Sequence, residues 1–166
     1  MGIKATQKAK LFIGGVKAQQ SADFTASDFT SETWVAIGWL EDLGEIGDEA
    51  EAITFDAIGE GRRFKLKGVR DAGTMEVKLG CDPADPGQIA LFAAEATPDD
   101  YSFKLEWNDA PPQVTSPNTG TPTRRLFIAQ VGAVKEGYGS ANDVIRLNVT
   151  LNVNSNVVRA AQVLDT

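Results

Sequence analysis

The chain is 166 residues long, 42% of its residues are hydrophobic, and its formal net charge is −7. This length fits one domain, 1–166, and no apolar run approaches the roughly 18 residues that a membrane-spanning helix needs. The absence of histidine excludes Ser-His-Asp catalysis, Cys-His catalysis and histidine metal sites, and the acidic balance disfavours nucleic-acid binding. A glycine-rich nucleotide loop is also missing. We therefore expect no enzyme activity, no cofactor, no metal and no membrane partner.

The first 31 residues are predicted to form an N-terminal arm followed by a loop. Up to Ala22 the only charged residues are basic, namely Lys4, Lys8, Lys10 and Lys17. Residues 18–31 are polar except for Phe24 and Phe29, so this part lacks the apolar periodicity of a helix or strand. We expect residues 18–31 not to fold on their own, and the basic arm to lack internal partners.

An acidic segment, 41–60, is predicted to be a loop. It contains eight carboxylates and no basic residue: Glu41, Asp42, Glu45, Asp48, Glu49, Glu51, Asp56 and Glu60. A solvated loop that keeps the chain soluble is one interpretation. The other is a contact with a basic part of a second copy, because uncompensated carboxylates repel one another.

A hairpin is predicted immediately after the acidic segment. Residues 62–68 and 74–80 both alternate apolar and polar side chains, and 69–73 contains the turn residues Asp71 and Gly73. Pairing Leu66 with Met75 and Phe64 with Val77 places both apolar sets on one face. The same register sets Lys65 opposite Glu76, a favourable charge pair.

One α-helix is predicted, over about 86–96. Asp85 is a suitable N-cap, Pro86 suits the first helical position, and Gln88 stands three residues after the cap as in a capping box. The helix should pack on a sheet through one apolar stripe spaced at i, i+3, i+4 and i+7, which consists of Ile89, Phe92, Ala93 and Ala96. Thr97 and Pro98 end it.

An aromatic strand and an extended loop follow the helix. Tyr101, Phe103, Leu105 and Trp107 alternate with polar residues, which places Trp107 on the core face. Residues 110–123 contain four prolines and no charge, a composition typical of an extended loop with polyproline character.

The last two strands are predicted to pair through a turn at 136–139. Residues 145–154 alternate strictly, whereas 126–131 is apolar on both faces. Such a two-sided strand is either covered within the subunit or buried against a neighbouring copy, and the sequence leaves both alternatives open. Residues 155–166 are expected to form a C-terminal arm.

Two of these motifs resemble the major tail tube proteins of long-tailed, siphovirus-type bacteriophages. They are the Lys-Gly-x-x-Asp-x-Gly turn at 67–73 and the Asp-Pro-Gly-Gln sequence at 85–88 that opens an alanine-rich helix. The resemblance implies a mainly β fold, an antiparallel sandwich or barrel-like tail tube fold with a flanking helix and extended loops and arms. It also implies hexameric rings that stack into a hollow tail through which DNA passes.

The resemblance further implies where copies meet. The long loop and the arms of such proteins contact the next ring, so the inter-ring candidates are Glu41, Asp42, Glu45, Asp48, Glu49, Glu51, Lys4, Lys8, Lys10 and Lys17. A lining without cations would let DNA slide. The polar row Asn148, Thr150, Asn152 and Asn154 is a candidate lumen lining, although a solvent-facing surface explains it equally well.

The implied partners are other copies, the tape measure protein, the tail terminator and the distal tail protein. The implied location is the virion, with assembly in the host bacterial cytoplasm. Two alternatives remain: a tube component of a contractile injection or secretion system (Hcp-like), and a β-sandwich binding module that would use Trp34, Trp39 and Trp107.

Overall fold

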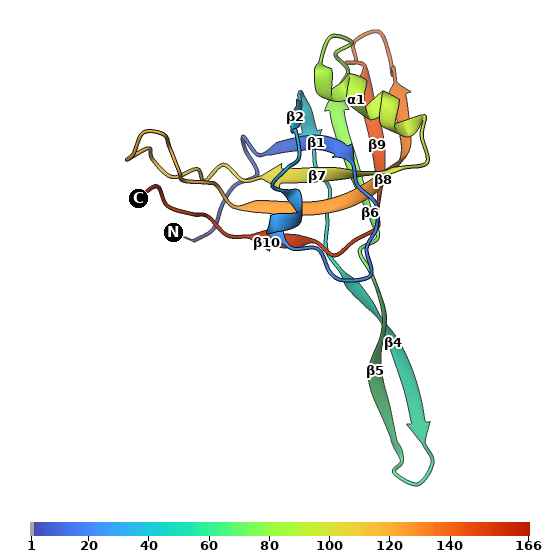
Figure 1. Ribbon diagram of the computed structural model, residues 1–166. Helices are drawn as coiled ribbons and strands as arrows, with labels where there is room; N and C mark the ends of the chain where they lie inside the picture. The colour runs from blue at the N-terminus through green and yellow to red at the C-terminus, as the bar shows by residue number, and fades with distance from the viewer. Residues whose placement is uncertain (1) are drawn as a thin grey trace.

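The computed structural model describes residues 2–166, which form mainly antiparallel strands and one α-helix, as predicted (Figure 1). The main sheet has eight strands in the order β2-β1-β7-β8-β9-β6-β3, and β10 pairs with β8. Its strands are β1 Lys10–Val16, β2 Val35–Ile37, β3 Leu40–Asp42, β6 Thr74–Gly80, β7 Asp100–Glu106, β8 Arg124–Gly137, β9 Arg146–Val153 and β10 Val158–Ala160.

The sheet curls until its two edges approach each other. β2 and β3 lie at opposite ends of the strand order, yet only Gly38 and Trp39 separate them in sequence. Because consecutive Cα atoms are about 3.8 Å apart, the Cα atoms of Ile37 and Leu40 cannot be separated by more than about 11 Å. The fold is therefore barrel-like rather than an open sheet.

The main core fills the inside of this curl. The predicted pairing of β8 with β9 is confirmed, and β9 also pairs with β6, so that Met75, Val77 and Leu79 lie opposite Leu151, Val149 and Leu147. All six side chains are buried. The strict alternation along β9 is thus explained by one face that is fully covered.

The two-sided apolar part of β8 is covered within the subunit. Phe127 and Ala129 face the main core, whereas Leu126 and Ile128 pack in a second cluster with Phe24, Phe29 and Val158. The polar segment 18–31 is therefore a strap across the outer face of β8. It includes the short 3-10 helix η1, Ala26–Phe29.

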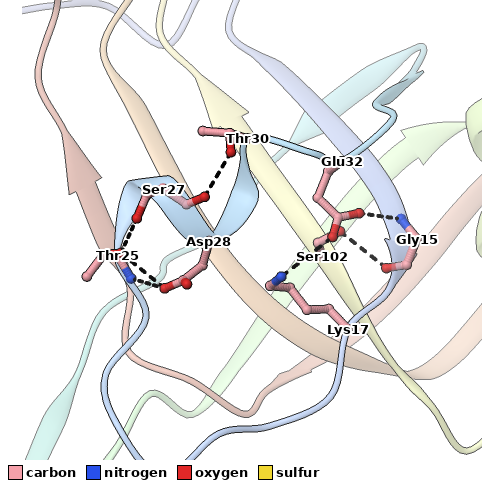
Figure 2. A network of polar contacts seen from close by, with 8 residues as sticks. All are labelled: Gly15, Lys17, Thr25, Ser27, Asp28, Thr30, Glu32 and Ser102. Carbon is pink, nitrogen blue, oxygen red and sulfur yellow. Dashed lines mark hydrogen bonds and ion pairs between the residues drawn. The ribbon is translucent and has the colours of Figure 1, made fainter.

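Polar contacts shape this strap and join the chain just after it to the end of β1 (Figure 2). At η1, the Thr25 backbone N–H donates to Asp28 Oδ2 at 2.7 Å and the Thr30 hydroxyl donates to the Ser27 carbonyl at 2.9 Å. Beyond η1, Glu32 Oε2 accepts from the Gly15 N–H at 3.1 Å, and its other oxygen lies 3.8 Å from Lys17 Nζ. The Phe24 and Phe29 rings provide the buried apolar surface of the strap. The hydrogen bonds and the ion pair fix the backbone around the two rings.

The predicted hairpin of 62–68 with 74–80 is wrong. β4, Glu49–Ala57, pairs with β5, Arg62–Asp71, in a separate two-stranded sheet that projects from the body (Figure 1). Phe64 lies opposite Phe55 and Leu66 opposite Ile53. β6 pairs with β9 instead because its apolar face is fully buried there, which a two-stranded ribbon could not achieve. The segment 41–60 is consequently not a loop but contributes most of β3 and all of β4.

The predicted helix is present as α1, Pro86–Glu95, and ends one residue earlier than expected. Asp85 caps it by accepting from the Gln88 N–H at 3.0 Å. The Gln88 side chain does not return to the cap. It is buried, accepting from the Asp82 N–H at 2.8 Å and donating to the Gly80 carbonyl at 2.8 Å. No helix in residues 2–166 is long and apolar enough to cross a membrane.

The predicted apolar stripe of α1 is not its buried face. The helix packs through Gly87, Gln88, Leu91 and Ala94. Position 87 decides this orientation, since a Cβ there would lie 2.2 Å from the carbonyl oxygen of Ala36 in β2. Ile89 and Phe92 are left 54% and 39% exposed.

The three tryptophans occupy different environments. Trp34 packs against the second cluster, and Trp39 is 69% exposed with its indole N–H donating to Asp82 at 3.0 Å. Trp107 follows β7 and is 36% exposed, so its predicted core position is wrong. The alternation of β7 ends at Glu106 and does not extend to position 107.

Candidate assembly surfaces

The hairpin β4–β5 carries an uncovered apolar row that we call the hairpin strip: Ile53, Phe55, Phe64 and Leu66. These side chains form two directly opposed cross-strand pairs and are between 45% and 61% exposed. Nothing within residues 2–166 covers them. An exposed apolar row on a projecting ribbon is a typical contact surface for another chain.

Three of the eight carboxylates of this region have basic partners within the chain. Asp56 binds Arg63 through two bonds of 2.6 and 3.1 Å, and Asp48 lies 3.0 Å from Arg70. Glu41 binds Arg146 of β9 at 2.7 Å. The expectation of uncompensated carboxylates is therefore wrong for these three, because the basic run of β5 folds back beside Asp48 and Asp56 and β9 brings Arg146 to Glu41.

The remaining inter-ring candidates lie as follows. Asp42 accepts from the Gly44 N–H at 2.8 Å, and Glu45, Glu49 and Glu51 form no ion pair within residues 2–166. Among the lysines, Lys17 pairs with Glu32 and Lys10 lies opposite Glu106 in β7. Lys4 lines a cavity together with Leu43 and Gly44, while Lys8 is exposed. The structure thus brings one lysine of the arm beside its own acidic segment.

The candidate lumen row lies on the face of β9 opposite the main core. Asn148 stands between Lys78 of β6 and Lys135 of β8. Thr150 donates to Glu76 Oε2 at 3.1 Å, and Asn154 donates to Asp100 Oδ1 at 2.7 Å. Asn152 lies opposite Gln130. This surface therefore mixes amides with both signs of charge, and its role as a lining stays a prediction.

A second exposed apolar surface lies on α1. Ile89 and Phe92, which we call the helix patch, stand one turn apart. In Figure 1 the helix lies at the end of the body remote from the hairpin tip. The sequence stripe that includes both residues was identified correctly as apolar, but it points outward.

The proline-rich loop and the C-terminal arm are joined by one carboxylate. Asp165 accepts from the backbone N–H groups of Val114, Thr115 and Thr119 at 2.5, 2.6 and 3.0 Å. It also accepts from the hydroxyls of Thr115 and Thr119. Apart from the pairing of Thr121 with Val163, residues 110–123 have no regular secondary structure. No sequence motif indicated this contact across about fifty residues.

This carboxylate predicts a pH dependence. The Thr115 hydroxyl, followed by the backbone donors, holds the pKa of Asp165 well below its ordinary value. A depressed folded-state pKa stabilises the fold above the unfolded pKa of about 3.9, and this stability is lost as the pH falls below about 4. Asp165→Asn should remove this pH-dependent part of the free energy of unfolding. Urea unfolding at several pH values would measure it, and identical pH profiles for wild type and variant would contradict the assignment.

No cluster of three acidic or cysteine side chains within residues 2–166 is placed to hold a metal ion.

Comparisons with known proteins show which solved structures share this fold. No protein-family model and no curated protein sequence matches the chain. Among solved structures, a chain of the anti-feeding prophage baseplate superposes with a TM-score of 0.67 at 12% identity, covering 97% of this chain and 98% of that one. The tail tube protein of SPP1 gives 0.61 at 13% identity, with 99% and 82% covered. The chain has the tail tube fold.

The similarity extends to another particle. A chain from the virion of a gene transfer agent gives a TM-score of 0.58 at 15% identity and covers 77% of this chain and 89% of that one. At these sequence identities the similarity establishes the fold alone. The function has to be argued from the chemistry of the exposed surfaces.

Proposed function

We propose that this protein is the major tail tube subunit of a bacteriophage of the long-tailed, siphovirus type. It polymerises as stacked hexameric rings, and phage DNA passes through the resulting channel. The observation that carries the proposal is the hairpin strip, an apolar ribbon that projects from a body with the tail tube fold and has no cover of its own. The role is structural and not enzymatic.

The two uncovered apolar surfaces suit repeated stacking. The hairpin strip and the helix patch are different surfaces at different ends of the subunit (Figure 1). A contact between unlike surfaces is heterologous, and repeated heterologous contacts generate rings or filaments rather than closed dimers. The strip replaces the acidic loop as the principal inter-ring contact, and the free carboxylates Glu45, Glu49 and Glu51 contribute at its base.

The channel and the partners follow from this assignment. The row Asn148, Thr150, Asn152 and Asn154 would line the lumen, where amides and a hydroxyl stand among lysines and carboxylates of the neighbouring strands. The tape measure protein would occupy the channel before DNA, and the tail terminator and distal tail protein would close the ends. Assembly would take place in the host bacterial cytoplasm and the product would belong to the virion.

A second candidate function is the tube of a contractile injection system. It is favoured by the superposition with the anti-feeding prophage chain over nearly the full length of both proteins, and by that with a chain of an extracellular contractile injection system at a TM-score of 0.63. Co-expression with the neighbouring tail genes separates the two, since only a contractile particle would surround the tube with a sheath.

Electron microscopy and analytical ultracentrifugation over a range of protein and salt concentrations test the proposal. We expect rings and tubes at high concentration, with a fraction that grows with concentration because association follows mass action. A strict monomer under all conditions would contradict it.

A further inference from the structure

Two arginines face each other across neighbouring strands, and neither is in an ion pair within the part of the chain that the structure describes. Arg125 of β8 and Arg159 of β10 occupy directly opposed positions, where like charges destabilise a sheet. Burial, followed by the charge of Arg159, lowers the pKa of Arg125, and the charge of Asp109 opposes this shift only in part. Neither guanidinium forms an ion pair anywhere in residues 2–166. An arrangement of this kind is relieved by an anion.

These arginines line a cavity of about 380 Å³ near the base of the hairpin, together with Arg70 and Asp48. Asp48 is already bound to Arg70 at 3.0 Å. Three cations and one anion give the cavity a net charge of 3 − 1 = +2. The positive charge is local to this cavity, since the chain as a whole has a net charge of −7.

The Arg125 guanidinium is held in place. Its Nη1 donates to the Arg124 carbonyl at 2.9 Å, and the group lies 4.8 Å from the centroid of the Trp107 ring. A fixed guanidinium loses little entropy when it binds a carboxylate, and arginine can bind both oxygens of such a group. The cavity is therefore prepared for a carboxylate.

We propose that this cavity binds Glu95 and Asp99 of a second copy of the chain, an inference that rests on the proposed stacking. Both residues are exposed and form no ion pair within residues 2–166. Glu95 is the last residue of α1, where the helix dipole disfavours a negative charge. Each site would relieve the unfavourable charge of the other.

The positions of the two sites agree with the stacking. Residues 95–99 continue from the helix patch, whereas the cavity lies beside Arg70 at the base of β5 and next to β10, away from α1 (Figure 1). A head-to-tail contact would place the helix patch on the hairpin strip and the two carboxylates on the cavity together. DNA phosphate is a weaker candidate because the surrounding chain is strongly acidic.

Reciprocal charge reversal tests the inference. Arg125→Glu/Arg159→Glu changes the cavity from +2 to 1 − 3 = −2, and Glu95→Lys/Asp99→Lys reverses the proposed partner. Each double variant alone should require about tenfold more protein to assemble, or more. An equimolar mixture should assemble like wild type, because every contact in an alternating stack again joins opposite charges. Lys135→Glu, an exposed change outside both sites, is the matched control.

The outcomes are distinguishable. Wild type that assembles while the equimolar mixture does not would overturn this inference and leave the proposed function intact. Wild type that never assembles would overturn both. Binding of short duplex DNA that is lost in Arg159→Gln, with assembly unchanged, would assign the cavity to phosphate instead. Where the double reversal prevents folding, Arg159→Gln and Glu95→Gln are combined, and strictly additive losses would contradict a direct contact.

Discussion

Replacing Leu91 by alanine should lower the free energy of unfolding of the isolated subunit by about 2–5 kcal/mol. Leu91 is 1% exposed in the main core beneath α1, so the change loses both the transfer free energy and the contacts around the cavity that it leaves. Phe92→Ala, one residue further along the helix, should cost less although it removes a larger side chain, because Phe92 is 39% exposed. Urea unfolding of both variants at a concentration below assembly measures the difference.

The same pair separates folding from assembly. Phe92→Ala should impair stacking in a subunit that remains folded, since its ring belongs to the helix patch. Equal losses of stability in the two variants would show that the orientation of α1 is wrong. Normal assembly of Phe92→Ala would show that the helix patch is not part of the interface.

Changing Phe55 and Phe64 together to serine should strongly weaken tube growth and leave the body folded. The two rings are directly opposed in the hairpin strip, and β4 and β5 form a sheet of their own, so the main core does not depend on them. Full burial of a phenylalanine contributes about 1.5–3 kcal/mol, and each 1.4 kcal/mol is about tenfold in affinity. Losing two such contacts should raise the assembly concentration by on the order of a hundredfold or more.

The opposite face of the same hairpin provides the control. Thr54 and Lys65 form the neighbouring cross-strand pair, and Thr54→Ser/Lys65→Ser alters the ribbon without touching the strip. Sedimentation and negative-stain images of the two double variants give the comparison. Tubes formed equally well by the phenylalanine variant would exclude the strip as the contact surface.

Local patterns in the sequence predicted most of the elements but not all of their partners. The alternation of β9 and the Asp85-Pro86 start of α1 are local signals, and both are confirmed. The pairing of β5 was mispredicted because the nearest alternating strand in sequence is β6, whereas the carboxylates of β4 concealed the alternation of Ile53, Phe55 and Ala57. The partner of a strand depends on burial in the whole fold, which periodicity alone does not report.

The assembly surfaces were predictable only in part. The apolar stripe of α1 was visible, but its direction depended on the close approach of Gly87 to Ala36, a tertiary constraint. The opposition of Arg125 and Arg159 required the register of β10, a strand of three residues. A short strand at the edge of an arm leaves almost no periodic signal, so the cationic cavity could not be foreseen.

The topology also sets an order of events during folding. The hairpin β4–β5 is made from a continuous stretch of chain, and such ribbons form within about 1–10 μs. The barrel instead requires pairs of residues that are far apart in sequence, such as Lys10 with Glu106 and Leu126 with Val158. Such non-local pairing is slow. The exposed ribbon is therefore expected to pair before the barrel on which α1 packs is complete. Growth is expected to occur onto finished subunits, and partly synthesised chains should be unable to prime a filament.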